Sequence, residues 1–153
     1  MCKINQTMDK TDLIKQTGEN ELLKFLGVRI AIATAERVVL TMEVTPKVHQ
    51  YMGIMNGGVS LYLCETAASI GVVASADLDR VTPVGIEINA NHLRAVSKGV
   101  ITVEAKPIYS GNTLSVWNID ITSDRGKLIC TGRCSVLHQK RPAVKPIANA
   151  PLR

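Results

Sequence analysis

Apolar residues recur at every second position in several stretches of the chain. In residues 37–44 the even-numbered positions hold Val, Leu, Met and Val, and Thr41 and Glu43 lie between them. This period is typical of a strand with one buried face. Strands are predicted at 28–33, 37–44, 81–94, 100–109, 113–122 and 127–138. Turn-forming residues at 97–99, 110–112 and 123–126 would join the last four strands into a meander.

Two other segments have the longer period of helices. Residues 11–26 form a short amphipathic pattern, and Gly27 follows as a C-terminal stop. Residues 57–76 are apolar on every side, and loop residues 45–55 precede them. The candidate buried positions of the first helix are Leu13, Leu22, Leu23 and Leu26.

A long apolar helix beside an antiparallel sheet predicts an α+β fold in which the sheet wraps around the helix. Because a sheet covers one side only, and residues 57–76 offer no charged outer face, a second subunit is expected to cover the rest. We therefore expect a homodimer or a dimer of dimers.

Composition and charge narrow the class of protein. The length of 153 residues, with 46% apolar and 20% charged residues, predicts one soluble domain over 11–139, a disordered segment at 1–10 and a loose, Pro-containing basic tail at 140–153. The net charge of +5 comes without aromatic–basic interleaving, which argues against nucleic-acid binding. We find no signal sequence and no apolar run that we expect to span a membrane, so a cytoplasmic protein is predicted.

The four cysteines have no metal-ligand spacing. Cys130 and Cys134 would lie two pleats apart on one strand, too far for a disulfide, so buried free thiols are expected for them and for Cys2 and Cys64. Asp120, Asp124 and Glu104 are also scattered, and we predict no metal site.

Glu65 is the only full charge between Lys47 and Asp77. A carboxylate is costly to desolvate in such an apolar helix. No Lys or Arg lies three or four residues away to pair with it. Glu65 is therefore a candidate general base or nucleophile.

The start of the same helix offers a second kind of chemistry. Helix N-termini present free N–H groups and a partial positive charge, and Gly57 and Gly58 allow a ligand oxygen to approach them. Glu65 follows Gly57 by eight residues, roughly 12 Å along a helix. One carbonyl group cannot contact both, so cooperation would require Glu65 from a neighbouring subunit.

The segments 50–65, 84–92 and 107–111 together resemble the hotdog-fold acyl-CoA thioesterases. The similarity covers about residues 27–138. It is strongest to the 4-hydroxybenzoyl-CoA and 1,4-dihydroxy-2-naphthoyl-CoA thioesterases and to phenylacetate-pathway relatives. The resemblance implies hydrolysis of an aromatic or medium-chain acyl-CoA, with coenzyme A as part of the substrate and no other cofactor.

The resemblance also implies roles for individual residues. Glu65 matches the catalytic carboxylate, and Gly57 matches the residue whose N–H polarises the thioester carbonyl. Gln50 matches a loop glutamine near that carbonyl, and Ser69 matches the Ser or Thr that assists the attacking water. An alternative for Ser69 is a hydroxyl bonded to its own helix.

A second group of residues is expected to bind the substrate. His92 matches a histidine near the substrate or the pantetheine arm, and Arg94 is a candidate contact for a CoA phosphate. Gly58 adds to the open helix start. Tyr62 and Trp117 could line an acyl pocket or pack in the subunit interface, and packing is the preferred interpretation for both.

Asn56 departs from the family pattern, which has His at this position. An amide can form hydrogen bonds but cannot become cationic near pH 7. This leaves two alternatives open: an acyl-CoA-binding or regulatory protein without turnover, and a hotdog dehydratase. The dehydratase would need a catalytic His with an acidic partner, and His49 is interpreted as a loop residue instead. Glu87 could be a second functional acid, but it is expected to face outward or to lie in an interface. His138 is expected to be solvated.

Overall fold

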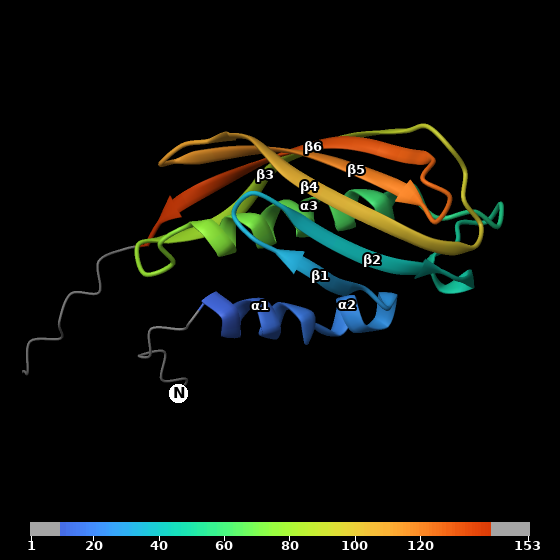
Figure 1. Cartoon of the computed structure of the whole chain (residues 1–153), viewed down its shortest axis with the longest axis horizontal. Coiled ribbons are helices and arrows are strands. Elements are labelled where there is room, and N and C mark those ends of the chain that lie inside the picture. Colours follow the sequence, from blue (N-terminus) through green and yellow to red (C-terminus); the bar gives the residue numbers. More distant parts are fainter. Residues whose placement is uncertain (1–9, 142–153) are drawn as a thin grey trace, which may run out of the picture.

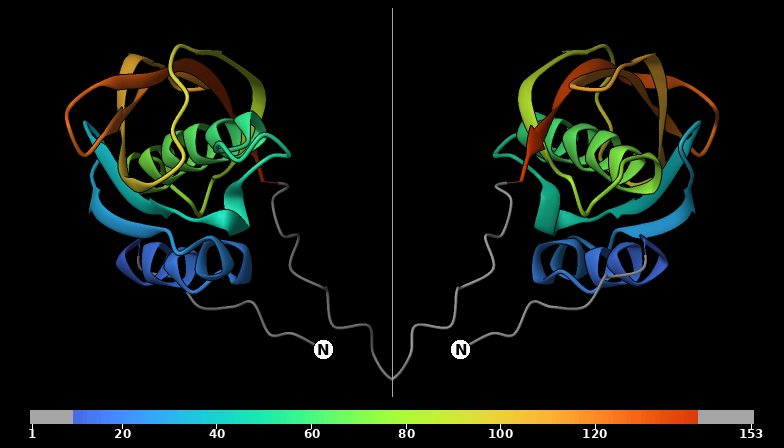
Figure 2. Two further views of the ribbon diagram at one scale, coloured as in Figure 1. Left: turned by 90° about the vertical axis from the view of Figure 1, so that its right-hand side faces the viewer. Right: turned by 90° about the vertical axis from the view of Figure 1, so that its left-hand side faces the viewer.

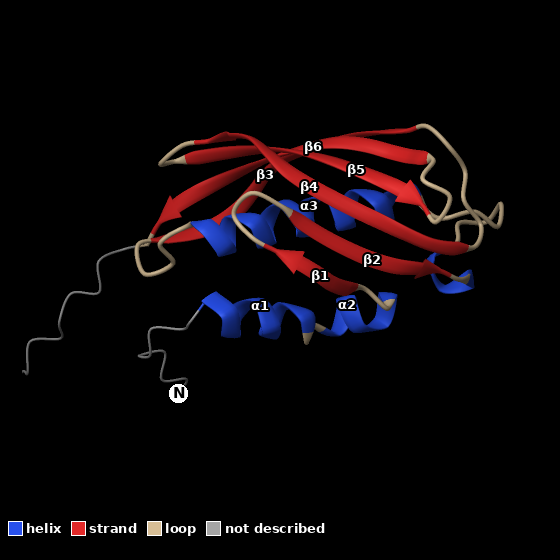
Figure 3. Ribbon diagram, viewed as in Figure 1, coloured by secondary structure: helices blue, strands red, loops and turns tan. Residues whose placement is uncertain are grey.

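Residues 10–141 are described by the computed structural model, and they form a six-stranded antiparallel sheet curved around one long helix (Figures 1 and 3). The predicted α+β hotdog architecture is confirmed. The elements in chain order are α1 (Lys10–Gly18), α2 (Glu21–Leu26), β1 (Arg29–Ala33), β2 (Val38–Val44), the 3-10 helix η1 (Pro46–Val48), α3 (Gly57–Ser75), β3 (Val81–His92), β4 (Gly99–Ser110), β5 (Leu114–Ser123) and β6 (Leu128–Lys140).

The strand order is β1-β2-β4-β5-β6-β3. The predicted four-strand meander is therefore wrong for its first strand, β3, which does not lie beside β4. β4, β5 and β6 are consecutive neighbours, but β3 pairs with β6 at the far edge of the sheet. Residues 93–98 connect β3, at one edge of the sheet, to β4 in its interior, and do not form a hairpin between neighbouring strands. They are held by backbone hydrogen bonds from Leu93 N–H to Ile129 O (2.8 Å) and from Met55 N–H to Val96 O (2.8 Å).

The core lies between α3 and the concave face of the sheet, as the end-on views in Figure 2 show. Trp117 on β5 is 1% exposed, and its indole N–H donates to Ser115 Oγ at 3.2 Å. A Cβ at Gly71 would lie 2.6 Å from two carbons of the indole ring, so the helix needs glycine where the ring lies on it. Trp117 thus packs, as preferred, but in the core of its own chain and not in the expected subunit interface.

The predicted helix at 11–26 is two helices. Asn20 breaks it, because its side-chain oxygen accepts from the N–H groups of Leu22 (2.9 Å) and Leu23 (3.4 Å) and so caps α2. Leu23 is 1% exposed, but Leu22 is 47% exposed, so the expected burial of Leu22 is wrong. Gly27, with φ of 74°, ends α2 as expected.

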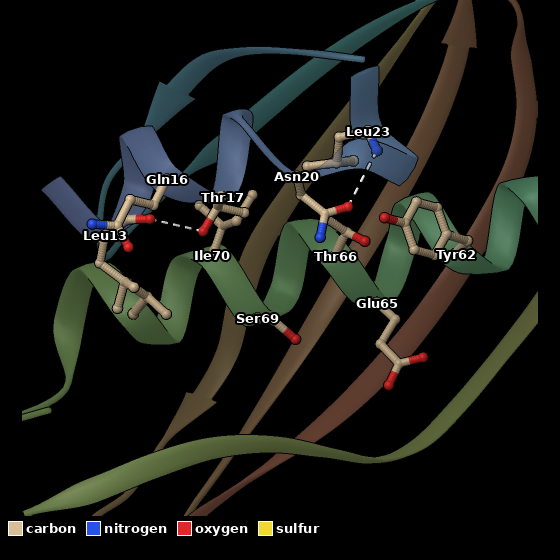
Figure 4. Close-up of a pocket in the computed structure, with 11 residues that line it drawn as sticks. Leu13, Gln16, Thr17, Asn20, Leu23, Tyr62, Glu65, Thr66, Ser69 and Ile70 are labelled. Carbon is tan, nitrogen blue, oxygen red and sulfur yellow. Dashed lines mark hydrogen bonds between the residues drawn. The ribbon is translucent and has the colours of Figure 1, made fainter. Parts of the chain in front are cut away.

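By length and composition alone, α3 could cross a membrane, contrary to the expectation that no apolar run would. Its packing within the sheet identifies it as the core helix of this fold. α1 packs against α3, and the close-up in Figure 4 shows the N-terminal helices beside it. The expected disordered segment and loose tail lie mainly outside the described residues, although Lys10 belongs to α1 and Lys140 to β6.

Three thiols gather where α3 meets β6. Cys64, Cys130 and Cys134 are buried and unpaired, as predicted, and Cys2 lies outside the described residues. A hydrogen bond with Cys130, together with burial, raises the pKa of Cys64. The same hydrogen bond lowers the pKa of Cys130, so the two thiols act as one hydrogen-bonded pair inside the core.

Candidate active site

Glu65 lies at the middle of α3 and is half-buried. It lines a cavity of about 510 Å³ between α3 and the two N-terminal helices (Figure 4). α3 contributes Tyr62, Thr66 and Ser69 to the polar lining. The rest of the lining comes from Leu13, Gln16, Thr17, Asn20, Leu23, Ile70 and Val73.

The Glu65 carboxylate points away from α1 and α2 and toward β3 (Figure 4), where it lies against Gly85. It has no hydrogen bond or ion pair with any residue of the range 10–141. Burial raises the pKa of Cys134 to about 12, and the negative charges of Glu65 and Glu87 add to this effect. Glu65 thus lies on the β3–β6 side of the helix with no counter-charge among residues 10–141.

Ser69 lies one turn after Glu65, and Figure 4 shows both side chains on the same side of α3. Its hydroxyl makes no hydrogen bond within the described part of the chain, so the alternative of a bond to its own helix is not observed. A water molecule between the two side chains would find an acceptor in Glu65 and a donor or acceptor in Ser69.

A second cluster surrounds the start of α3. Asn56 is the N-cap, and its side-chain oxygen accepts from Gly58 N–H at 2.7 Å. The N–H of Gly57 has no partner among residues 10–141, so it is available to a ligand, whereas that of Gly58 is occupied. A cavity of about 360 Å³ opens here, lined by Gln50, Gly57, Ser60, His92, Arg94 and their apolar neighbours.

Gln50 and His92 reach this cavity from different elements. The side-chain oxygen of Gln50 accepts from Met52 N–H at 2.6 Å, which fixes the side chain and leaves its NH₂ group free to donate. The ring of His92, at the end of β3, lies over the helix start, because a Cβ at Gly57 would be 2.8 Å from His92 Nε2. Arg94 is exposed at the edge of the same cavity.

The structure therefore brings the predicted residues together in two groups at two places along α3. Glu65, Ser69 and Tyr62 share one cavity, and Gln50, Gly57 and His92 share the other. Roughly 12 Å of helix separates Gly57 from Glu65. A single chain presents the free N–H of Gly57 at one place and the Glu65 carboxylate at another.

Strand β3 contacts both groups, a feature that sequence reasoning missed. Gly85 and His92 are seven residues apart, and in a regular strand they would face opposite sides. The register of β3 against β6 shifts between Gly85 and Glu87, which indicates a β-bulge at Ile86. After this shift both Gly85 and His92 face α3. A glycine inside an apolar strand was the available signal.

Other candidates lie outside the two groups. His49 Nε2 is 2.9 Å from Ser97 O, which confirms its interpretation as a loop residue. Glu87 is exposed, as predicted, and accepts from Asn89 Nδ2 at 2.6 Å. His138 is half-buried, with Nε2 3.2 Å from Ser115 Oγ, so its expected solvation is wrong. Residues 10–141 contain no group of three or more His, Cys, Asp or Glu side chains that could hold a metal ion.

Comparisons with known proteins place the chain in a family. The family model described as "Thioesterase superfamily" matches residues 52–130. A 1,4-dihydroxy-2-naphthoyl-CoA hydrolase of Listeria monocytogenes is 41% identical over 120 residues, covering 78% of this chain and 97% of the relative.

Two crystal structures are also similar. A mutant thioesterase from Pseudomonas aeruginosa has a TM-score of 0.80 and 31% identity, covering 90% of this chain and 98% of that one. A thioesterase from Haemophilus influenzae has a TM-score of 0.77 and 32% identity, covering 94% and 97%.

Proposed function

Because the chain belongs to the thioesterase superfamily and is a thioester hydrolase with the hotdog fold, we propose that it hydrolyses an aromatic or medium-chain acyl-CoA. The products are a free carboxylic acid and coenzyme A. The observation that carries the proposal is Glu65: the half-buried residue borders a cavity, and its carboxylate, which points toward β3, has no partner among the described residues. The Listeria relative, a 1,4-dihydroxy-2-naphthoyl-CoA hydrolase by name, supports an aromatic acyl group.

The start of α3 polarises the thioester carbonyl. Gly57 N–H donates to the carbonyl oxygen, and the NH₂ group of Gln50 donates from the loop. Negative charge develops on that oxygen as the carbonyl carbon is attacked, and the positive end of the helix favours it. His92 and Arg94 line the same cavity, where they would contact the pantetheine arm and a CoA phosphate.

Glu65 acts on the carbonyl carbon as a general base or as a nucleophile. As a base it removes a proton from a water held with Ser69, a C–O bond forms, and the C–S bond breaks with release of the CoA thiolate, which then takes up a proton. As a nucleophile it forms a C–O bond to the carbonyl carbon while the C–S bond breaks and the CoA thiolate leaves and takes up a proton. Water then hydrolyses the resulting acyl anhydride to the free acid and restores the Glu65 carboxylate. Either route consumes one water molecule and needs no metal or prosthetic group.

Glu65 works with the Gly57 of a neighbouring subunit. The two residues lie in separate cavities of one chain, roughly 12 Å apart along α3. A two-fold pairing that brings one carboxylate opposite the partner's helix start also does the reverse, and so forms two equivalent sites. The dimer and a dimer of dimers both satisfy this requirement.

The alternative of a binding protein without turnover rested on Asn56, because the family pattern implied by the resemblance has His at this position. Asn56 has a structural role as the N-cap of α3, and its side-chain NH₂ group remains available as a donor. The relatives are named as hydrolases and thioesterases, which favours turnover. The dehydratase alternative lacks support, because His49 contacts Ser97 O rather than an acidic side chain.

A thiol-release assay tests the proposal with benzoyl-, phenylacetyl-, dihydroxynaphthoyl- and straight-chain acyl-CoAs. We expect turnover of at least one aromatic or medium-chain substrate and a fall in kcat of about 100-fold or more for Glu65→Gln, because proton removal is lost. Glu87→Gln is the matched control, since it neutralises an exposed carboxylate outside both cavities. Tight acyl-CoA binding without turnover would refute the enzyme, and full activity of Glu65→Gln would refute the mechanism.

A further inference from the structure

Glu65 and Gly85 are in direct contact across the gap between α3 and β3. A Cβ at Gly85 would overlap Oε1 of Glu65 and lie 3.0 Å from its Cδ and 3.3 Å from its Cγ. The backbone at Gly85 does not itself require glycine, because its φ is not among the positive values of this chain. The space taken by the carboxylate is what excludes a side chain at position 85.

The bulge at Ile86 turns this position toward the helix. Gly85 pairs with Val136 and His92 pairs with Cys130, and both partners on β6 are fully buried. Because paired residues point to the same face of a sheet, Gly85 and His92 both face α3. One strand thus contacts the carboxylate through Gly85 and the helix start through His92.

We propose that Gly85 is a positioning residue, which holds the Glu65 carboxylate in its reactive place by leaving room for it on β3. The inference rests on the proposed function, because only a catalytic Glu65 gives the contact with Gly85 a role in the reaction. Any larger residue would move the carboxylate rather than the strand, since the overlapping atoms are the end of a flexible side chain. A larger residue at position 85 would leave the fold intact but would move the Glu65 carboxylate away from the position it needs for attack on the thioester.

Gly85→Ala tests this in the full chain, with the acyl-CoA that the wild type hydrolyses fastest. A misplacement of about 1 Å can cost on the order of 100-fold in rate, so we expect kcat to fall about 10- to 100-fold. KM should change less than about threefold, because the helix start and its cavity are untouched. Gly18→Ala is the matched control, since its Cβ would meet only Ile30 Cδ1 at 3.8 Å.

A second-site change separates displacement of the carboxylate from general damage. Glu65→Asp is one methylene shorter, so its carboxylate withdraws from β3 and leaves room for a methyl group at position 85. In the Glu65→Asp background, Gly85→Ala should lower kcat by less than about threefold, although Glu65→Asp alone is slow. An equal loss in both backgrounds, or no loss in the wild-type background, would overturn the inference.

The outcome also distinguishes this inference from the proposed function. An active wild type whose kcat is unaffected by Gly85→Ala would reject the inference alone. A wild type that hydrolyses no thioester would reject the proposed function. Crystal structures of the wild type and Gly85→Ala would then still test the contact: a displaced carboxylate is expected, and an unmoved carboxylate beside a shifted strand would contradict it.

Discussion

Asn56 should affect stability and catalysis in separable ways. Its side-chain oxygen is the acceptor for Gly58 N–H at 2.7 Å, and Asn56→Ala removes it. Loss of an N-cap costs about 1 kcal/mol of the free energy of unfolding. For a chain of this size that corresponds to a fall in Tm of about 2–4 °C. Urea unfolding followed by circular dichroism would measure the free energy of unfolding, and thermal unfolding would measure Tm.

Asn56→Asp separates the two roles. The carboxylate still accepts from Gly58 N–H and adds a negative charge at the positive end of α3, so stability should be retained or rise by up to about 1 kcal/mol. The same charge lies beside Gly57 N–H and opposes the negative charge that develops on the substrate oxygen. We expect kcat to fall about tenfold or more.

Asn56→Ser is the matched control, because serine is a neutral N-cap. Its stability should stay within about 0.5 kcal/mol of the wild type, and its kcat should be closer to the wild-type value than that of Asn56→Asp. The reasoning fails if Asn56→Ala melts at the wild-type temperature, since the cap would then be unimportant. It also fails if Asn56→Asp hydrolyses substrate as fast as the wild type.

Two further changes concern stability. Gly71→Ala forces a methyl group against the buried ring of Trp117 and should cost about 1–3 kcal/mol in urea unfolding, whereas Gly111→Ala meets an exposed tyrosine ring and should cost less. The ion pairs of Glu104 with Lys106 and Arg37 lower the pKa of Glu104 from 4.5. The stabilisation that the ionised Glu104 gives the fold is therefore full above pH 4.5 and is lost as the pH falls below it. Glu104→Gln should lower the free energy of unfolding by about 0.5 kcal/mol at pH 7 and should not change it in acid. A cost that persists unchanged in acid would contradict this assignment.

The strands and the central helix were predictable because their patterns are local. Alternation in 37–44 places β2, and the apolar run at 57–76 matches α3 to within one residue. Neighbour relations are not local, so β3 was expected beside β4 and lies beside β6 instead. A pattern of period two identifies a strand but does not name its partner.

The site followed a similar division. The isolated charge of Glu65 and the glycines at the helix start were visible in the sequence, and the distance between them predicted two separate groups. The sequence did not show that Gly85 faces α3, because this orientation depends on a bulge that only the register of β3 against β6 reveals. The cap at Asn20 could have been recognised, since Asn is a preferred N-cap and Glu21 follows it.

Complementation between two inactive variants tests most directly whether the active site is shared between subunits. One variant carries Glu65→Ala, and the other carries Gln50→Ala with Gly57→Ala. Refolded together, half of the dimers should be mixed, and each mixed dimer should hold one intact site. The mixture should therefore regain about one quarter of the wild-type kcat per chain. Activity no higher than that of the separate variants, in a mixture shown to contain mixed dimers, would place the whole site within one chain and contradict the account.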